Sequence, residues 1–410
     1  MLIINALLEQ IRKRSALLDS VTHLDISIDL QNGNSLDPHP GLVGDIAQAV
    51  SLGNEFAQLV PGITYYEWPF VTNDDVLLAF IRAATKHYAS NLSRISCELT
   101  VLSDVEHFSD KLRHLDIRCY SNDFSHFPLV QSAQLKMLRL IGIEKEFTWS
   151  SFQGDKGPNV LDFSSLKHLS LGVPFVTEEE TQDNSPDTIW YGPADLFEYT
   201  VLAPQLVKFR TQLCPFSLSC LSSITGVDIL PEVEILTMAK VVLKITNLKL
   251  NDVIKRKFSG YAKESVHNML YMNWIDFAND IFCIPDFAEN TRIDLNSIGS
   301  SFDASTINWP YLNCLIIRER IDIEYMLMLI KQLPNLTELK VFNLKLILTD
   351  DGHLSIPEIY ESSDDELQPL DVNIKRITLM AGPLLLPATL QADTTEYLCK
   401  RLPSLDIVEY

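Results

Sequence analysis

The sequence is poor in the residues that most catalytic and nucleotide-binding sites require. It has 15 glycines in 410 residues, and it contains no GxGxxG, GxxxxGK[ST], HExxH or GxSxG motif. Its 9 histidines are dispersed along the chain. Phosphate-binding loops need closely spaced glycines, and metal sites need clustered ligands. We therefore expect a non-catalytic protein with no metal and no cofactor.

Positive charge is also scarce. The chain has 33 lysines and arginines against 54 aspartates and glutamates, a net charge of −21. This balance argues against nucleic acid or an anionic membrane as the partner, because phosphate binding needs a basic surface. No apolar run reaches the roughly 18 residues that span a bilayer. The opening MLIINALLEQIRKRS carries its charges after a short apolar stretch, unlike a secretory signal. We expect a cytoplasmic or nuclear protein.

Cysteine usage supports the same compartments. The 7 cysteines are Cys97, Cys119, Cys214, Cys220, Cys283, Cys314 and Cys399. Their number is odd, their spacing is irregular, and several stand within apolar stretches. This pattern favours reduced, buried thiols over disulfides or a zinc site.

One short apolar pattern recurs along the chain. It occurs as LRHLDIRCY from Leu112, LKMLRLIGI from Leu135, LKHLSLGVP from Leu166 and LTELKVFNL from Leu336. Six of the 20 prolines stand two residues before the first apolar position of such a stretch, namely Pro61, Pro204, Pro231, Pro310, Pro334 and Pro403. Proline cannot continue a helix and favours an extended chain next to it. Two segments before these prolines, DIEYMLMLIKQLP and DTTEYLCKRLP, have helical spacing with acidic residues first and basic residues last. The predicted unit is a helix, a proline and a short strand.

The second apolar position of each stretch, here called the marker, locates a predicted strand. The markers are Leu24, Tyr66, Ile95, Leu115, Leu138, Leu169, Phe209, Leu236, Leu270, Ile293, Leu315, Leu339, Ile377 and Val408. Their intervals run from 20 to 42 residues. A strand with a return segment of this size cannot bury its apolar face alone and must stack on its neighbours. The spacing predicts an α/β solenoid with one curved parallel sheet and with helices and irregular segments on its convex side. Antiparallel pairing would contradict this prediction.

The stretches LRHLDI, LKHLSL and LPNLTELKV make the chain resemble irregular leucine-rich-repeat proteins of the fungal F-box/LRR kind. In that family an N-terminal F-box binds a Skp-type adaptor, and the repeats capture substrates for ubiquitination. Residues 1–20 lack the Leu-Pro-x-Glu opening and the closing Trp of an F-box. The resemblance therefore implies a leucine-rich-repeat module that captures a protein partner. The alternative is the substrate-recognition subunit of an SCF-type E3 ubiquitin ligase with a lost or divergent F-box, whose partners would include ubiquitin-ligase components.

Three stretches interrupt the array: the turn-rich QNGNSLDPHPG from Gln31, and the acidic stretches from Thr177 and Pro357. We expect residues 1–410 to form a single solenoid, residues 1–60 to be an atypical N-terminal cap, and acidic loop insertions to lie near 177–188 and 357–368. Ser362 and Ser363 each have an acidic residue three positions on, which makes them candidate phosphorylation sites.

The residues on either side of each marker should point away from the core, since alternate side chains of a strand face opposite ways. Seven of them are basic: Arg94, Arg139, Lys208, Arg210, Arg292, Lys340 and Arg376. Six are acidic: Asp25, Glu67, Asp116, Asp294, Glu338 and Glu409. This face is more basic than the chain as a whole. His23, His114 and His168 share one position in the pattern, and we interpret them as exposed strand residues.

A partner-binding patch is predicted on consecutive strands. It consists of Arg139, His168, Lys208 and Arg210, with Tyr271 adding apolar contact. No acidic residue flanks the markers of these strands, so the positive charge should be unpaired. Unpaired charge on an acidic protein favours an acidic peptide or phosphopeptide of a protein partner, or a cap formed by the loop from Thr177.

Overall fold

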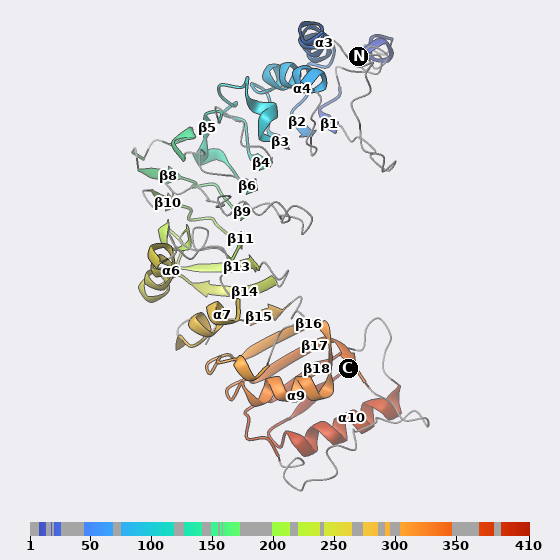
Figure 1. Ribbon diagram of the computed structural model, residues 1–410, viewed down its shortest axis with the longest axis vertical. Helices are drawn as coiled ribbons and strands as arrows, with labels where there is room; N and C mark the ends of the chain where they lie inside the picture. The colour runs from blue at the N-terminus through green and yellow to red at the C-terminus, as the bar shows by residue number, and fades with distance from the viewer. Residues whose placement is uncertain are drawn as a thin grey trace, which may run out of the picture. The chain divides into compact units, whose positions relative to one another are not determined.

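The structure is a computed structural model of the whole chain (Figure 1). It describes residues 8–13, 18, 20–25, 45–68, 75–118, 127–141, 149–154, 156–157, 159–172, 199–213, 220–237, 242–264, 274–285, 292–295, 304–346, 369–380 and 387–410. The chain forms two compact units. Unit 1 comprises Met1–Val207 and Phe216–Val227, and unit 2 comprises Lys208–Pro215 and Asp228–Tyr410. Both are mixed α/β, built on extensive and mostly parallel strand pairing.

The main strands of unit 1 pair only in parallel. They are β1 (His23–Asp25), β2 (Tyr65–Trp68), β3 (Arg94–Glu98), β4 (His114–Arg118), β6 (Met137–Ile141) and β9 (His168–Gly172), in that order. The markers of these strands are all paired with one another in register, from Leu24 to Leu169. Every one after Leu24 is buried. The predicted register is therefore confirmed in unit 1.

A tight turn leads into many of the strands of both units. The N–H of a leucine donates to the carbonyl three residues earlier, at 2.9 to 3.2 Å. The leucines are Leu112, Leu135 and Leu166 in unit 1 and Leu312, Leu336 and Leu405 in unit 2. All except Leu405 are buried. Each is the first apolar position of the repeated pattern, which explains why the pattern is visible in the sequence.

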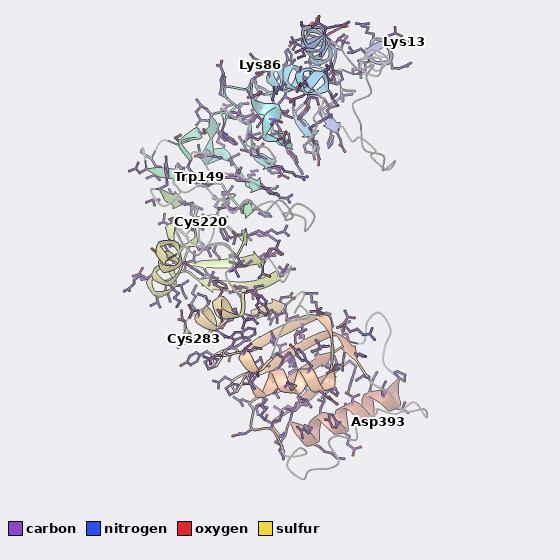
Figure 2. All side chains as sticks on the ribbon, in the orientation of Figure 1. Lys13, Lys86, Trp149, Cys220, Cys283 and Asp393 are labelled. Atoms are coloured by element: carbon purple, nitrogen blue, oxygen red, sulfur yellow. The ribbon has the colours of Figure 1, made fainter. Side chains whose placement is uncertain are left out.

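Short strands form a second layer in unit 1. They are β5 (Val130–Gln131) with β7 (Phe152–Gln153), and β8 (Val160–Asp162) with β10 (Thr200–Leu202) and β12 (Ile224–Thr225), all paired in parallel. Between the layers lies an aromatic cluster in which Trp149 contacts Phe152 at 5.2 Å and Phe163 at 6.3 Å between ring centroids. Trp149, which is labelled in Figure 2, is fully buried. The chain thus alternates between a long strand and a short return strand.

Two helices pack together ahead of β3. Helix α3 (Ile46–Leu59) begins at Asp45, whose carboxylate accepts the N–H of Ala47. Helix α4 (Asp75–Tyr88) has an acidic first turn and a basic last turn, and it leads directly into β3.

The described residues of unit 2 form eight main strands. They are β11 (Lys208–Gln212), β13 (Ile229–Leu236), β14 (Val242–Lys249), β15 (Arg292–Leu295), β16 (Cys314–Asp322), β17 (Glu338–Lys345), β18 (Arg376–Leu379) and β19 (Ile407–Glu409), in that order. The markers from Ile293 to Val408 pair in register, as predicted.

The prediction of an all-parallel sheet is wrong at β14, which runs antiparallel to β13 and to β15. Only residues 237–241 separate β13 from β14. A parallel return needs a crossover of about a dozen residues or more, so this short link forces a hairpin.

The marker predicted at Leu236 is also wrong. Phe209 pairs with Val233, and Val233 pairs with Ile245. All three are fully buried. Pro231 lies inside β13 instead of before it, which shifts the pattern by three residues. The marker at Leu270 lies outside the described residues.

The helices of unit 2 are α6 (Asp252–Glu264), α7 (Trp274–Phe282), α9 (Ile323–Lys331) and α10 (Ala388–Arg401). The two helices predicted before Pro334 and Pro403 are confirmed as α9 and α10. The carboxylate of Asp322 caps α9 by accepting the N–H of Tyr325 at 2.7 Å. Helix α9 packs against β16 (Figure 1).

Cysteine burial agrees only partly with expectation. Cys97, Cys220 and Cys314 are buried, whereas Cys283 and Cys399 are exposed; Cys220 and Cys283 are labelled in Figure 2. Cys283 stands in the turn after α7 and Cys399 lies within α10, so neither belongs to the strand pattern. No helix among the described residues is both long and apolar enough to cross a membrane. The acidic segments 177–188 and 357–368 lie outside the described residues.

Candidate protein-binding face

The residues that flank the buried marker of each main strand point away from the core and define an outer face in each unit. In unit 1 the position before the marker carries His23, Tyr65, Arg94, His114, Met137 and His168, and the position after it carries Asp25, Glu67, Ser96, Asp116, Arg139 and Ser170. In unit 2 the corresponding rows are Lys208, Glu232, Thr246, Arg292, Cys314, Glu338, Arg376 and Ile407, then Arg210, Glu234, Lys244, Asp294, Ile316, Lys340, Thr378 and Glu409. Pairing in register places these side chains on neighbouring strands about 5 Å apart.

The N-terminal strands of unit 1 carry a stacked group on the outer face. The rings of His23 and Tyr65 lie 3.7 Å apart between centroids, and the guanidinium of Arg94 lies 4.6 Å from the Tyr65 centroid. The Tyr65 hydroxyl donates to Glu67. Burial, followed by the hydrogen bond to Glu67, raises the pKa of Tyr65. These contacts fix the side chains in place, so the side chains would lose little conformational entropy when a partner binds.

Arg139 is paired, contrary to the prediction of free charge. Its Nη1 lies 3.3 Å from Oδ2 of Asp116, which also accepts from the Ser96 hydroxyl at 3.4 Å. Asp116 is largely buried, and its Oδ1 has no hydrogen-bond partner among the described residues. His168 is exposed on β9. Burial, and then the charges of Arg94, Lys136 and His168, lower the pKa of His114.

Strand β3 ends in a buried acid that the sequence pattern did not single out. Glu98 is only 2% exposed and lies opposite Arg118 in register. Its Oε2 accepts the Thr100 hydroxyl, and its Oε1 has no hydrogen-bond partner in the part of the chain that the structure describes. Burial raises the pKa of Glu98, although the bonds from Thr100 and the charge of Arg82 partly oppose this.

The raised pKa predicts that Glu98→Gln increases the stability of the protein, and that this increase depends on pH. The pKa of such an acid is higher in the folded protein than in the unfolded chain. Its contribution to the free energy of unfolding is fully present at low pH. The contribution is lost as pH rises from the pKa of the unfolded state toward the pKa of the folded state. The variant should therefore be more stable than the wild type near neutral pH, by on the order of 1 kcal/mol, because it removes an unpaired buried charge. Urea unfolding of both proteins at pH 5 and pH 7.5 measures the difference, which should grow with pH. Glu396→Gln, at an exposed position on α10, is the control. A pH-independent difference would contradict the assignment.

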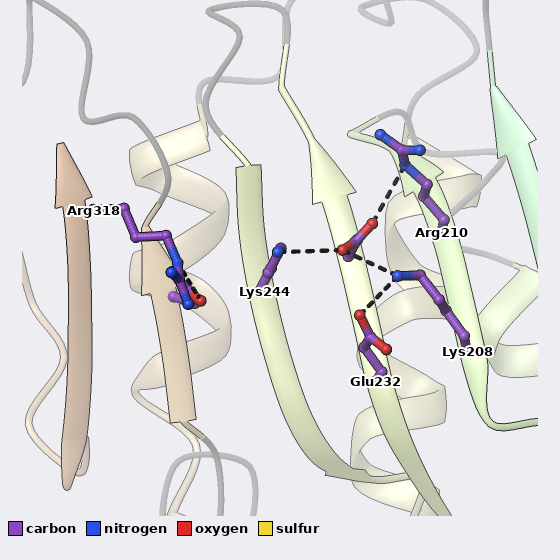
Figure 3. Close-up of polar contacts among 7 residues, drawn as sticks. Lys208, Arg210, Glu232, Lys244 and Arg318 are labelled. Carbon is purple, nitrogen blue, oxygen red and sulfur yellow. Dashed lines mark hydrogen bonds and ion pairs between the residues drawn. The ribbon is translucent and has the colours of Figure 1, made fainter. Parts of the chain in front are cut away.

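A denser set of ion pairs covers β11, β13 and β14 in unit 2 (Figure 3). Glu234, whose side chain is 10% exposed, lies 3.2 Å from Nζ of Lys208, 3.4 Å from Nε of Arg210 and 3.6 Å from Nζ of Lys244. Lys208 also bonds to Glu232 at 2.7 Å. Burial alone would raise the pKa of Glu234, but the hydrogen bond from Lys208 and the three positive charges outweigh it, and the net effect lowers that pKa. We call these five residues the Glu234 cluster.

Further pairs continue along the same face. Nε of Arg318 contacts both carboxylate oxygens of Asp294 at 2.8 and 2.9 Å, and its guanidinium lies 4.7 Å from the Phe342 ring centroid. Glu338 contacts Lys340 at 3.2 Å and Arg292 at 3.6 Å. The outer face of unit 2 is thus an array of fixed, alternating charges.

The predicted patch is divided between the units. Arg139 and His168 belong to unit 1, whereas Lys208 and Arg210 belong to unit 2. The prediction that the charge is unpaired is wrong, because Val233 and not Leu236 is the inward residue of β13, so Glu232 and Glu234 stand beside Lys208 and Arg210. Whether these residues bind a partner stays a prediction. Tyr271, Ser362, Ser363 and the loop from Thr177 lie outside the described residues.

The corrected register changes the charge of the outer face. Strands β13 and β14 add Glu232, Glu234 and Lys244 to the residues counted from the sequence. The outer-face rows of the two units then contain eight basic and eight acidic side chains. The face is balanced in sign instead of basic. The signal for the missing strand was the alternation in VLKIT, residues 242–246, where the buried Leu243 and Ile245 alternate with Val242, Lys244 and Thr246.

No group of three or more histidine, cysteine or carboxylate side chains within the described ranges could hold a metal ion. No family model matches the sequence, and no curated protein matches it.

Proposed function

We propose that the chain is a protein-interaction module of the leucine-rich-repeat type, without catalytic activity, which captures a protein partner on its outer face. One observation carries the proposal. The buried marker residues are in register from strand to strand, and this holds the flanking charged side chains in fixed rows on the opposite face. Such rows present many polar groups at a regular spacing, with their positions fixed by pairing before a partner arrives.

The repeat class is supported by two local features. The same leucine-centred turn precedes strands in both units, and short parallel return strands alternate with long ones in unit 1. A stack of this kind suits a solenoid, in which each repeat contacts its neighbours and leaves a continuous surface for binding. The hairpin of β13 and β14 is a departure from a regular array.

Matched substitutions on the two sides of the strands test the proposal. Ser170→Arg and Thr378→Arg each add a bulky cation to an outer-face position, in unit 1 and unit 2 respectively. Met328→Arg on α9 and Val253→Arg on α6 make a similar change at exposed helical positions. Proximity labelling or affinity purification from the source cells should recover partners about tenfold less with at least one outer-face variant, because a protruding side chain disrupts a complementary surface.

The helical controls should recover partners as the wild type does. Loss confined to the controls would place the interface on the helices and overturn the proposal. Stoichiometric co-purification of a Skp-type adaptor would instead favour the alternative, a substrate-recognition subunit of a ubiquitin ligase.

A further inference from the structure

We propose that Arg210 and Lys244 form a seat for a carboxylate group of an acidic segment in the protein partner. The inference rests on the proposed function and specifies the chemistry of the partner. It begins from the geometry of β11, β13 and β14, in which Arg210, Glu234 and Lys244 occupy one row across three strands. The buried residues Phe209, Val233 and Ile245 lie on the other side of the same strands.

Glu234 holds the two cations toward a common point. Nε of Arg210 lies 3.4 Å from Oε2 of Glu234, and Nζ of Lys244 lies 3.6 Å from Oε1 of the same carboxylate. Strands β11 and β14 are two steps apart, about 10 Å, so without this carboxylate the side chains of Arg210 and Lys244 would have no reason to converge. Glu234 is therefore a positioning residue and not a direct ligand of the partner.

The cations retain donors for a ligand. Arg210 uses only Nε toward Glu234, and its side chain is 49% exposed. Its terminal nitrogens point away from Glu234 (Figure 3) and have no partner within the portion of the chain that the structure describes. Lys244 is 31% exposed, and its contact with Glu234 is longer than a hydrogen bond. Lys208 is already bonded to Glu232 and Glu234, so it is not part of the seat.

Charge explains why the ligand should be a carboxylate. The Glu234 cluster has three cations and two acids, a surplus of one positive charge. The next acid along the row, Asp294, does not neutralise Lys244, because both of its oxygens are bonded to Arg318. One surplus charge suits a single carboxylate, and the planar fork of an arginine matches its two oxygens.

A peptide titration of the full chain tests the seat. The probe is a fluorescein-labelled glutamate-rich peptide, and its glutamine counterpart is the control probe. Fluorescence anisotropy is measured at physiological salt, where charges further apart than about 8 Å are largely screened. We expect the wild type to bind the glutamate peptide and not the glutamine peptide. The double variant Arg210→Gln/Lys244→Gln should weaken binding about tenfold or more, the loss of two charge-assisted contacts.

The matched control is Arg292→Gln/Lys340→Gln. The side chains of Arg292 and Lys340 are 47% and 29% exposed. They lie in the two outer-face rows of unit 2, and both contact Glu338. The control removes the same net charge but leaves the seat intact, so binding should change by less than about twofold. Arg210→Lys keeps the charge beside Glu234 and removes the fork. It should fold like the wild type and still weaken binding of the glutamate peptide several-fold. This single variant therefore tests the seat even if the double variant is unstable.

Three results would overturn the seat: equal weakening by both double variants, equal binding of both peptides, or no binding by the wild type. If the seat fails while Ser170→Arg or Thr378→Arg still reduces partner recovery, the interaction module stands. If the peptide binds as expected while neither outer-face variant affects partner recovery, the seat stands and the proposed function fails.

Discussion

Replacing Gly53 by alanine should destabilise unit 1, although alanine favours helices. Gly53 lies in the middle of α3, where it faces α4. A Cβ atom there would lie 2.3 Å from the carbonyl oxygen of Phe80 and 2.9 Å from Cβ of Ala83. The first of these atoms is backbone, so the two helices must move apart. Overpacking of this kind costs about 1 to 3 kcal/mol or more, which exceeds the roughly 1 kcal/mol that alanine gains over glycine in a helix.

The chain offers a matched control for this substitution. Gly260 lies within α6, and a Cβ added there meets no atom within 4 Å. Gly260→Ala should therefore stabilise the protein by up to about 1 kcal/mol. Hydrogen exchange of the full chain would report the two effects separately, with faster exchange in α3 and α4 for Gly53→Ala and slower exchange in α6 for Gly260→Ala. Unchanged or slower exchange in α3 would show that the helices are not packed as closely as described.

This helix contact is an example of what the sequence could not predict. The segment around Gly53 has helical spacing, but nothing in it shows that α4 would approach the glycine so closely. The marker residues could be predicted, because a local sequence signal identifies each of them. In LRHLDIRCY the turn, the first buried leucine and the marker Leu115 lie within a few residues of one another. Local patterns of this kind fix the strands and their inward side.

The ion pairs depended instead on contacts between strands. Arg210 and Glu234 are far apart in the sequence, and they meet only because Phe209 pairs with Val233. An error of three residues in one strand moved two acids off the predicted face and made its cations seem unpaired. Because side chains alternate along a strand, an odd shift places the wrong residues on the outer face. Electrostatic predictions from sequence are therefore only as good as the register on which they rest.

The register of β13 gives the second large expected effect. Val233→Asp should destabilise unit 2 by several kcal/mol, because it places a carboxylate in the buried row between Phe209 and Ile245, where it cannot be hydrated. Leu236→Asp should cost much less. Leu236 stands at the end of β13 on the outer face and is partly exposed. An acid there would lie on the same side of β13 as Glu232 and Glu234.

The pattern of apolar residues alone makes the opposite prediction, since it assigns Leu236 to the core. Urea unfolding of Val233→Asp and Leu236→Asp, with Val233→Ala as a milder variant, distinguishes the two registers. Val233→Ala should itself cost about 1 to 3 kcal/mol, because it leaves a small cavity beside Phe209. If Leu236→Asp proved the more damaging change, Leu236 would be the inward residue, and Glu234 would no longer face Lys208, Arg210 and Lys244. The stability ranking of these two variants therefore tests the geometry on which the carboxylate seat depends, independently of any ligand.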